Sequence, residues 1–123
     1  MSDWDAAWLV GLLEGEGCFG LRQDNRPGRR PTISVKLQMC DEDVVQRAHK
    51  FMGAETAVLD RQTAKPHWSD AYEVAVYGVR AEELMRAVLP HMGNRRSAKI
   101  RECLGATNLS HHPKVPKAGE VTL

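Results

Sequence analysis

Two carboxylates near the N-terminus stand where they could hold a divalent cation. Glu14 and Glu16 follow an apolar run, Ala6 to Leu13, and they alternate with Gly15 and Gly17. If the run is helical, both carboxylates lie at its C-terminal end, where the helix dipole disfavours negative charge by about 0.3 to 1 kcal/mol. A cation is expected to offset that charge, and carboxylate oxygens are ligands that Mg²⁺ accepts.

The segment that carries these carboxylates is predicted to be a helix that needs a partner. Ser2 and Asp5 have the spacing of a capping pair, so we expect a helix from there to Gly17. The helix is apolar nearly all round, and such a helix must be covered on more than one side. In a chain of 123 residues little remains to cover the side opposite the sheet. The same helix from a second copy, across a two-fold axis, is the simplest cover.

Two glycines inside this helix support the pairing. Gly11 and Gly15 each cost about 1 kcal/mol relative to alanine, so their presence needs a reason. Spaced four apart, they form a smooth stripe on which another helix backbone could approach closely. The residues expected at the dimer interface are Trp8, Gly11, Leu12 and Gly15. In such a dimer the two helix ends would bring their carboxylates together, an arrangement that a divalent metal would make favourable.

The remaining pattern predicts an α+β domain with an antiparallel four-stranded sheet and helices packed on one face. Four segments with strand character are Cys18 to Gln23, Thr32 to Met39, Ala54 to Arg61 and Ala71 to Tyr77. Between the two pairs of strands we expect a helix capped by Asp41 and stopped by Gly53. A helix with Ala81 and Leu89 on its apolar face follows the last strand, and then, after a break near Pro90 and Gly93, a shorter helix from about Asn94 to Leu104. The domain is expected to cover residues 1–106, with residues 107–123 as a loosely held tail.

Composition narrows the classes of function. The net charge is only +1, but basic residues gather in two places, between Cys18 and Lys36 and between Asn94 and Arg101, as in proteins that contact nucleic acid. The apolar run is far below the roughly 20 residues that a membrane span needs. Three widely spaced cysteines predict free thiols in a reducing compartment. We therefore expect a protein of a reducing cytoplasm that is not secreted and does not bind a membrane.

The run from Leu9 to Gly17, LVGLLEGEG, followed by Cys18 and Phe19, resembles the signature of the LAGLIDADG homing endonucleases in their single-motif, homodimeric form. The order helix, strand, strand, helix, strand, strand, helix over residues 3 to 105 extends this resemblance over most of the chain. It implies an αββαββα fold and a site-specific double-strand DNA endonuclease. Such an enzyme would act as a homodimer on a long pseudo-palindromic target, using Mg²⁺ or another divalent metal and leaving short 3′ overhangs.

The same resemblance implies roles for individual residues. Glu16, at the last acidic position of the motif, would be the catalytic metal ligand, assisted by the main-chain carbonyl of Gly15. Arg95 falls where the family often carries a basic residue beside the active site, with Arg96 as a one-residue alternative. Gln38 or Met39 matches a region where a polar side chain commonly helps to place water, and of the two we choose Gln38. Glu14 would be structural. Glutamate replaces the commoner aspartate at position 16, which keeps the charge and lengthens the arm.

DNA would be recognised by the polar face of the sheet, because a β-ribbon fits the major groove. Strand alternation assigns polar residues to this face and Phe19, Leu21, Val74 and Val76 to the core. Arginines in the loop between the first two strands are expected to grip phosphates. The residues predicted to contact DNA are Arg22, Asp24, Arg26, Arg29, Arg30, Thr32, Ser34, Lys36, Gln38, Glu73, Arg96 and Lys99.

Two other functions on the same scaffold remain open at this stage, a DNA-binding regulator that has lost cleavage and an intron RNA-splicing maturase. A different class, the ββα-metal nucleases, is suggested only by His111 and His112. These two histidines lack zinc-type spacing to Cys103, so a surface pair is favoured.

Overall fold

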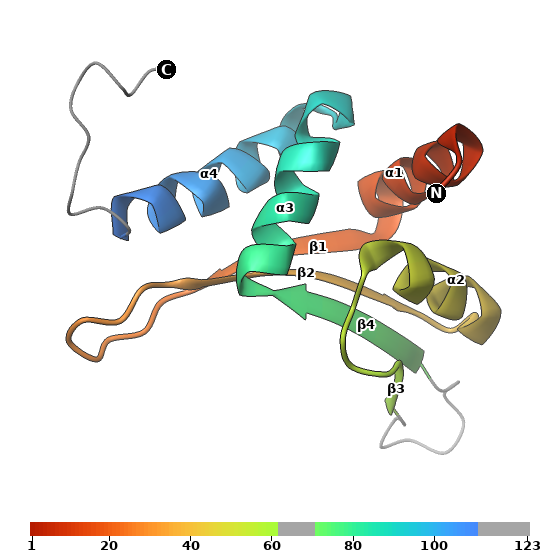
Figure 1. The fold of residues 1–123 in the computed structure, drawn as a ribbon, viewed down its shortest axis with the longest axis horizontal. Coiled ribbons are helices and arrows are strands. Elements are labelled where there is room, and N and C mark those ends of the chain that lie inside the picture. The colour runs from red at the N-terminus through yellow and green to blue at the C-terminus, as the bar shows by residue number, and fades with distance from the viewer. Residues whose placement is uncertain (62–70, 111–123) are drawn as a thin grey trace.

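The computed structural model describes residues 1–61 and 71–110. Helices and strands follow one another in the order predicted from the sequence (Figure 1). Their bounds are α1 Asp3–Glu16, β1 Gly17–Arg22, β2 Thr32–Met39, α2 Glu42–Met52, β3 Leu59–Arg61, β4 Ala71–Tyr77, α3 Gly78–Val88, the 3₁₀ turn η1 Leu89–His91, and α4 Asn94–Ser110.

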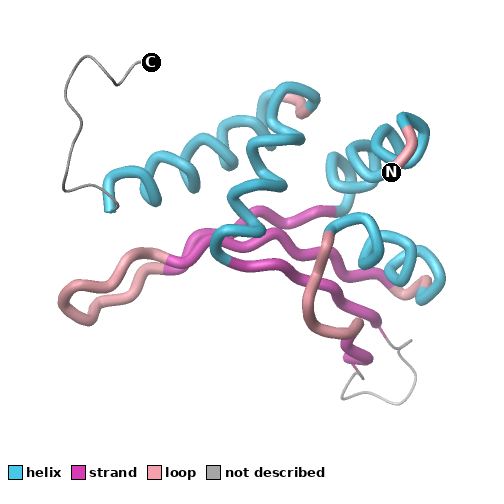
Figure 2. The backbone as a smooth tube through the Cα atoms, in the orientation of Figure 1, coloured by secondary structure: helices cyan, strands magenta, loops and turns pink. Residues whose placement is uncertain are grey.

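The four strands form one antiparallel sheet in the order β1-β2-β4-β3. Residues paired across neighbouring strands share a face, so Val35 lies between Phe19 and Val76, whereas Ser34 lies between Gly20 and Tyr77. The first set is buried and belongs to the core. Helices α1 to α4 cover this inner face, and within residues 1–61 and 71–110 no helix lies on the opposite face (Figures 1 and 2). The predicted α+β architecture is therefore confirmed.

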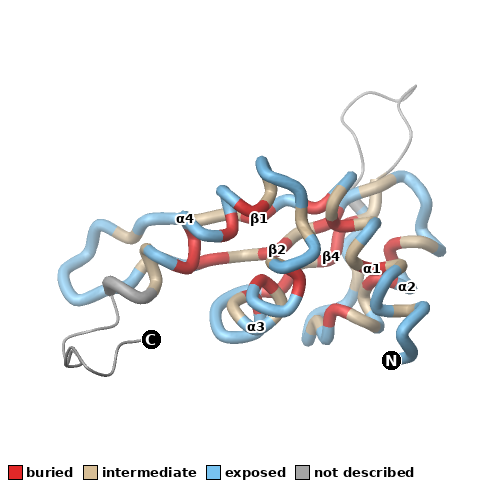
Figure 3. The backbone as a smooth tube through the Cα atoms, turned by 90° about the horizontal axis from the view of Figure 1, so that it is seen from above, coloured by how far each residue is buried: buried red, intermediate tan, exposed pale blue. Residues whose placement is uncertain are grey.

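The core lies between the inner face of the sheet and the helices. Figure 3 shows buried stretches along β2 and β4 and on the helix turns that face them. Ile33, Val35 and Leu37 supply the centre of the sheet, and each helix adds two or three buried apolar residues. Those from the helices are Leu9 and Leu13 of α1, Val45, Ala48 and Met52 of α2, Ala81, Met85 and Val88 of α3, and Ile100, Cys103 and Leu104 of α4.

The ends of α1 follow from local chemistry. Asp5 N–H donates to Ser2 Oγ at 3.1 Å, and Ser2 N–H donates to Asp5 Oδ2 at 3.4 Å, which confirms the predicted capping pair. At the other end Gly17 turns directly into β1. A Cβ at Gly17 would lie 2.8 Å from Leu13 O, so only glycine fits this junction without a shift of the backbone. The helix end is thus fixed against the sheet.

Two predicted bounds were wrong. The segment from Ala54 to Arg61 was expected to be a strand throughout, but only Leu59–Arg61 pairs with β4. Ala54 and Val58 pack against the core from irregular backbone. Their apolar side chains therefore indicate burial and not pairing with another strand. The last helix runs to Ser110, well past the predicted end at Leu104. Residues 111–123, including His111 and His112, lie outside the described part.

The predicted free thiols are confirmed: Cys18 and Cys40 are exposed and Cys103 is buried. Burial raises the pKa of the Cys103 thiol. No helix in residues 1–61 and 71–110 is long and apolar enough to cross a membrane.

Candidate metal site and nucleic-acid interface

One side of α1 is open to solvent along its length. Only Leu9 and Leu13 of the helix are buried. No atom lies within 4 Å of the position that a Cβ would take at Gly11 or at Gly15, and Trp4 on the same side is 86% exposed. The glycine stripe predicted from the sequence is therefore uncovered on its Cβ side by any other part of the described chain.

Trp8 and Leu12 lie at the edges of this open side. The Trp8 ring packs edge-on against Phe51 of α2, with ring centroids 6.0 Å apart. The guanidinium of Arg47 stacks over the Trp8 ring at 4.0 Å and also reaches Asp5 Oδ1 at 3.5 Å. Leu12 packs partly against the core. These contacts hold α1 on α2 and leave Gly11 and Gly15 as the free part of the predicted interface.

The C-terminal end of α1 meets the N-terminal end of α4, and Arg96 joins them. Its Nε donates to Glu14 O at 3.0 Å, its Nη2 to Gly15 O at 3.3 Å, and its Nη1 to Gly17 O. Carbonyls at a helix end have no partner within the helix, and a cation there is stabilised by the dipole. Arg96 therefore supplies the positive charge that the sequence required at this end.

Glu14 makes the reverse contact. Its Oε1 accepts a hydrogen bond of 2.7 Å from Gly93 N–H, the residue that precedes α4. Gly93 O in turn accepts the Ser97 N–H, the first bond of that helix. An anion at a helix N-terminus is favourable because the first N–H groups are unsatisfied. This contact supports the structural role expected for Glu14.

Glu16 is exposed and makes no hydrogen bond or ion pair within residues 1–61 and 71–110. It lies directly after the Gly15 carbonyl, so one chain offers two oxygen donors of the type that Mg²⁺ binds. No group of three or more His, Cys, Asp or Glu residues able to hold a metal occurs in the described part of the chain. The donors fit one half of a metal site, and a complete site needs oxygens from a second chain or from a substrate.

Of the two adjacent arginines, Arg95 is exposed and Arg96 is half-buried. The guanidinium of Arg96 is directed at α1, whereas Arg95 faces solvent; the assignments of Arg96 as a DNA contact and as the alternative to Arg95 stay predictions. A signal for this difference exists in the sequence. Arg96 precedes Ile100 by four residues and Cys103 by seven, so it falls on the apolar face of α4, which Arg95 does not.

The outer face of the sheet carries the predicted polar residues of β1 and β2. Arg22 pairs with Thr32, Gly20 with Ser34, and Gln38 with Glu73. Lys36 lies over the ring of Tyr77, with Nζ 5.8 Å from the centroid. A hollow of about 350 Å³ opens on this face; it is lined by Cys18, Gly20, Leu21, Arg22, Thr32, Ser34, Lys36 and Tyr77. The structure brings Arg22, Thr32, Ser34 and Lys36 together.

Tyr77, 52% exposed, was not among the predicted residues of this face. The alternation of Ala71, Glu73, Ala75 and Tyr77 along β4 would have indicated it. Glu73 has the predicted orientation, but it is only 8% exposed and has a partner within the chain. It is less accessible than the other polar residues of the face.

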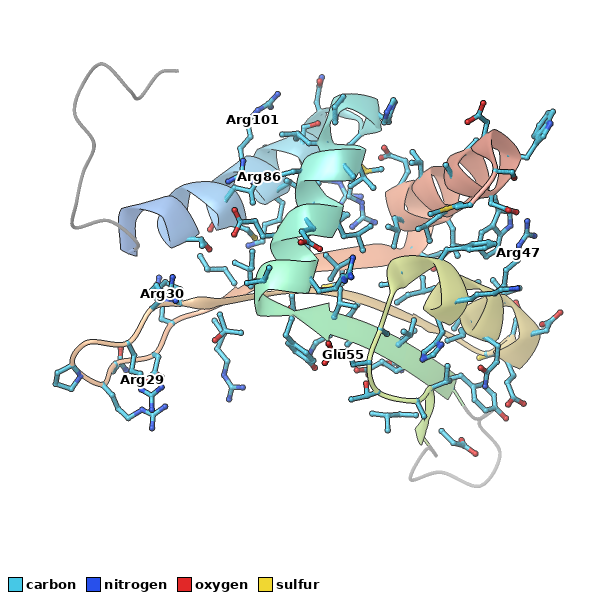
Figure 4. The ribbon with its side chains drawn as sticks, viewed as in Figure 1. Arg29, Arg30, Arg47, Glu55, Arg86 and Arg101 are labelled. Atoms are coloured by element: carbon cyan, nitrogen blue, oxygen red, sulfur yellow. The ribbon has the colours of Figure 1, made fainter. Side chains whose placement is uncertain are left out.

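Three arginines project from the loop between β1 and β2. Arg26 forms a two-bond pair with Asp24, with Nε–Oδ1 3.0 Å and Nη2–Oδ2 2.8 Å. The Arg26 side chain holds the pKa of Asp24 below its usual value and has its own pKa raised. Figure 4 shows Arg29 on the open side of the sheet and Arg30 turned toward the helices. Of the two loop arginines labelled in Figure 4, Arg29 is the one on the sheet's open side. Lys99 is exposed and contacts Glu102 at 3.5 Å.

Three solved structures similar to this chain are complexes of homing endonucleases with DNA. I-Vdi141I, an archaeal intron-encoded homing endonuclease complexed with DNA, has a TM-score of 0.60 and 14% identity, over 81% of this chain and 66% of that one. The chain has the fold of the LAGLIDADG homing endonucleases. I-CvuI with its target in the presence of Ca matches with a TM-score of 0.62 and 20% identity, over 80% of this chain and 62% of that one.

A further complex, of I-CvuI with the I-CreI target in the presence of Mg and with the DNA not cleaved, gives a TM-score of 0.64 and 18% identity. It covers 85% of this chain and 68% of that one, so the chain spans about two thirds of the length of these homing-endonuclease structures. No family model matches the chain, and no curated protein matches it. The likeness confirms the resemblance at the level of the fold.

Proposed function

We propose that the protein is a site-specific double-strand DNA endonuclease that works as a homodimer with Mg²⁺ or a similar divalent metal. The observation that carries this proposal is the open glycine stripe of α1, which ends in the exposed Glu16 beside the Gly15 carbonyl. Homing endonucleases bound to DNA share the fold.

The stripe supports pairing of α1 with the same helix of a second copy. A helix backbone can approach glycines more closely than any other residue, and nothing in the described chain occupies this space. A two-fold axis along the stripe places the two α1 ends, and so the two Glu16 side chains, next to each other.

The two Glu16 carboxylates and the two Gly15 carbonyls then form one set of oxygen donors between the chains. The chemistry that a bound divalent cation supplies there is activation of a water molecule and stabilisation of the leaving oxygen. Arg95, exposed at the start of α4, neutralises charge that develops on the phosphate. Gln38, exposed at the end of β2, orients water.

The outer face of the sheet supports recognition of duplex DNA. It presents Arg22, Lys36 and Gln38, which suit guanine and adenine edges in the major groove. Arg29 extends past the sheet on the same side and binds phosphate. A dimer repeats this surface about its axis, so the target is long and pseudo-palindromic.

Cleavage of a pool of duplex DNA with randomised inserts, in the presence of Mg²⁺, tests the proposal. The expected products are double-strand breaks with short 3′ overhangs, whose sequenced ends define a pseudo-palindromic site. Glu16→Gln abolishes cleavage and keeps affinity for the selected site. Tight binding to a duplex that stays intact would indicate a regulator, and preference for folded RNA over any duplex would indicate a maturase.

A further inference from the structure

The contact between Arg96 and Gly15 has a consequence for metal binding. Arg96 Nη2 lies 3.3 Å from the Gly15 carbonyl oxygen, which the proposed function uses as a metal ligand. The guanidinium is held in place by two further bonds, to Glu14 O and to Gly17 O. A fixed positive charge thus already lies beside the carbonyl oxygens at the C-terminal end of α1.

Charges of both signs meet at this end of α1 within one chain. Glu14, Glu16 and the α1 dipole contribute negative charge, whereas Arg96 and the N-terminus of α4 contribute positive charge. Arg96 is half-buried, so solvent screens its charge less than that of a fully exposed side chain.

We propose that Arg96 is the built-in counter-cation of the α1 end and that it weakens the binding of a divalent ion there. This inference rests on the proposed metal site. A cation that coordinates the Gly15 carbonyl is repelled by the guanidinium that shares the same oxygen, and it must either displace Nη2 or bind beside it. Arg96 therefore stabilises the metal-free end and opposes its loading.

Substitution of Arg96 separates this role from support of the fold. A residue that only supports the fold would, when replaced, lower stability and leave metal affinity equal or weaker. A counter-cation, when replaced, lowers the stability of the metal-free protein and strengthens metal affinity. The two accounts therefore predict opposite signs for the change in affinity.

The test measures Mn²⁺ binding to metal-free protein without DNA, from the loss of the free-ion electron paramagnetic resonance signal. Mn²⁺ accepts the same oxygen ligands as Mg²⁺. Arg96→Gln is expected to lower the Mn²⁺ dissociation constant about tenfold, since it removes a neighbouring positive charge. Arg101→Gln removes the same charge from the same helix, at a position turned away from the sheet (Figure 4), and is expected to leave the constant unchanged.

Arg96→Lys covers the case in which Arg96→Gln does not fold. Lysine keeps the charge but cannot donate to three carbonyls in a fixed plane, so we expect a dissociation constant between those of the wild type and Arg96→Gln. If Glu16→Gln removes Mn²⁺ binding, the metal site stands. Folded Arg96 variants that then bind Mn²⁺ as the wild type does, or more weakly, would overturn this inference and leave the proposed function untouched. If no variant shows binding that depends on Glu16, the metal site itself is wrong, and the inference fails with it.

Discussion

Glu14 of α1 and Arg96 of α4 make reciprocal contacts, each with the backbone at the end of the other's helix. Glu14, near the end of α1, accepts the Gly93 N–H at the start of α4, and Arg96, in the first turn of α4, donates to three carbonyls at the end of α1. Each charged group satisfies backbone groups of the other helix and lies at the end whose dipole favours its sign. These reciprocal contacts fix the direction in which α1 presents Glu16.

Replacing Glu14 is expected to loosen the junction. Glu14→Ala leaves the Gly93 N–H without its acceptor and should lower the free energy of unfolding by about 1.5 to 3 kcal/mol, the range for a hydrogen bond to a charged group. Glu102→Ala is the control, because its 3.5 Å contact with Lys99 is exposed and should contribute less than about 0.5 kcal/mol. Equal losses in urea denaturation of the two variants would contradict the role given to Glu14.

The junction also depends on glycine at position 17. A Cβ there would lie 2.8 Å from Leu13 O and 2.9 Å from Leu13 Cδ2, so Gly17→Ala should cost about 1 to 3 kcal/mol through forced backbone shifts. Gly105→Ala offers the matched change in α4, where a Cβ meets no atom within 4 Å. It should raise stability by up to about 1 kcal/mol through helix propensity. Thermal unfolding of the pair should therefore show shifts of opposite sign.

Acid should weaken the start of α1. The hydrogen bond from the Ser2 hydroxyl lowers the pKa of Asp5 from 3.8, followed by backbone and Arg47 contacts that act in the same direction. A lowered folded-state pKa gives stability that is present above the unfolded value and is lost as pH falls through the folded value. Asp5→Asn should thus be less stable than the wild type at neutral pH, and the difference should disappear in strong acid. Asp3→Asn removes a charge from the same turn and serves as the control. If Asp3→Asn lost as much stability at neutral pH as Asp5→Asn, the assignment to the capping pair would be refuted.

The loop arginine on the open side of the sheet should contribute to affinity for any DNA sequence. Loss of one phosphate contact reduces the slope of the logarithm of affinity against the logarithm of salt concentration by about 1. Arg29→Gln is expected to show this change, and Arg101→Gln, on the helical side, is expected to keep the wild-type slope. Fluorescence anisotropy across a salt series measures both. An unchanged slope for Arg29→Gln would remove Arg29 from the interface.

Much of the fold could be predicted because its signals are local. The strict alternation of Thr32 to Met39 gave the bounds of β2, and the spacing of Ser2 and Asp5 gave the start of α1. The end of α4 could not be read in the same way, since Gly105 resembles a stop but lies inside an exposed part of the helix. Gly105 itself therefore does not determine whether the helix ends or continues; the residues on either side do.

The candidate site was harder to predict because it depends on contacts between distant segments. Glu16 is assigned from the motif, whereas the choice between Arg95 and Arg96 depends on how α4 is rotated against α1. That rotation is set by the packing of Ile100 and Cys103 in the core. The sequence alone therefore left two arginines where the structure distinguishes one that faces solvent from one that is bound.

The central claim is that two copies of α1 meet along the glycine stripe, and sedimentation equilibrium of the wild type and Gly11→Leu tests it most directly. A Cβ at Gly11 meets no atom within 4 Å among the described residues outside its own helix backbone, so the fold should survive while the interface is blocked. Gly105→Leu is the matched control, because a Cβ at Gly105 is equally free. The account predicts a species of twice 13.7 kDa for the wild type and the control, and a single chain for Gly11→Leu. A wild type that stays at the mass of one chain at working concentration, or a Gly11→Leu variant that still pairs, would contradict it.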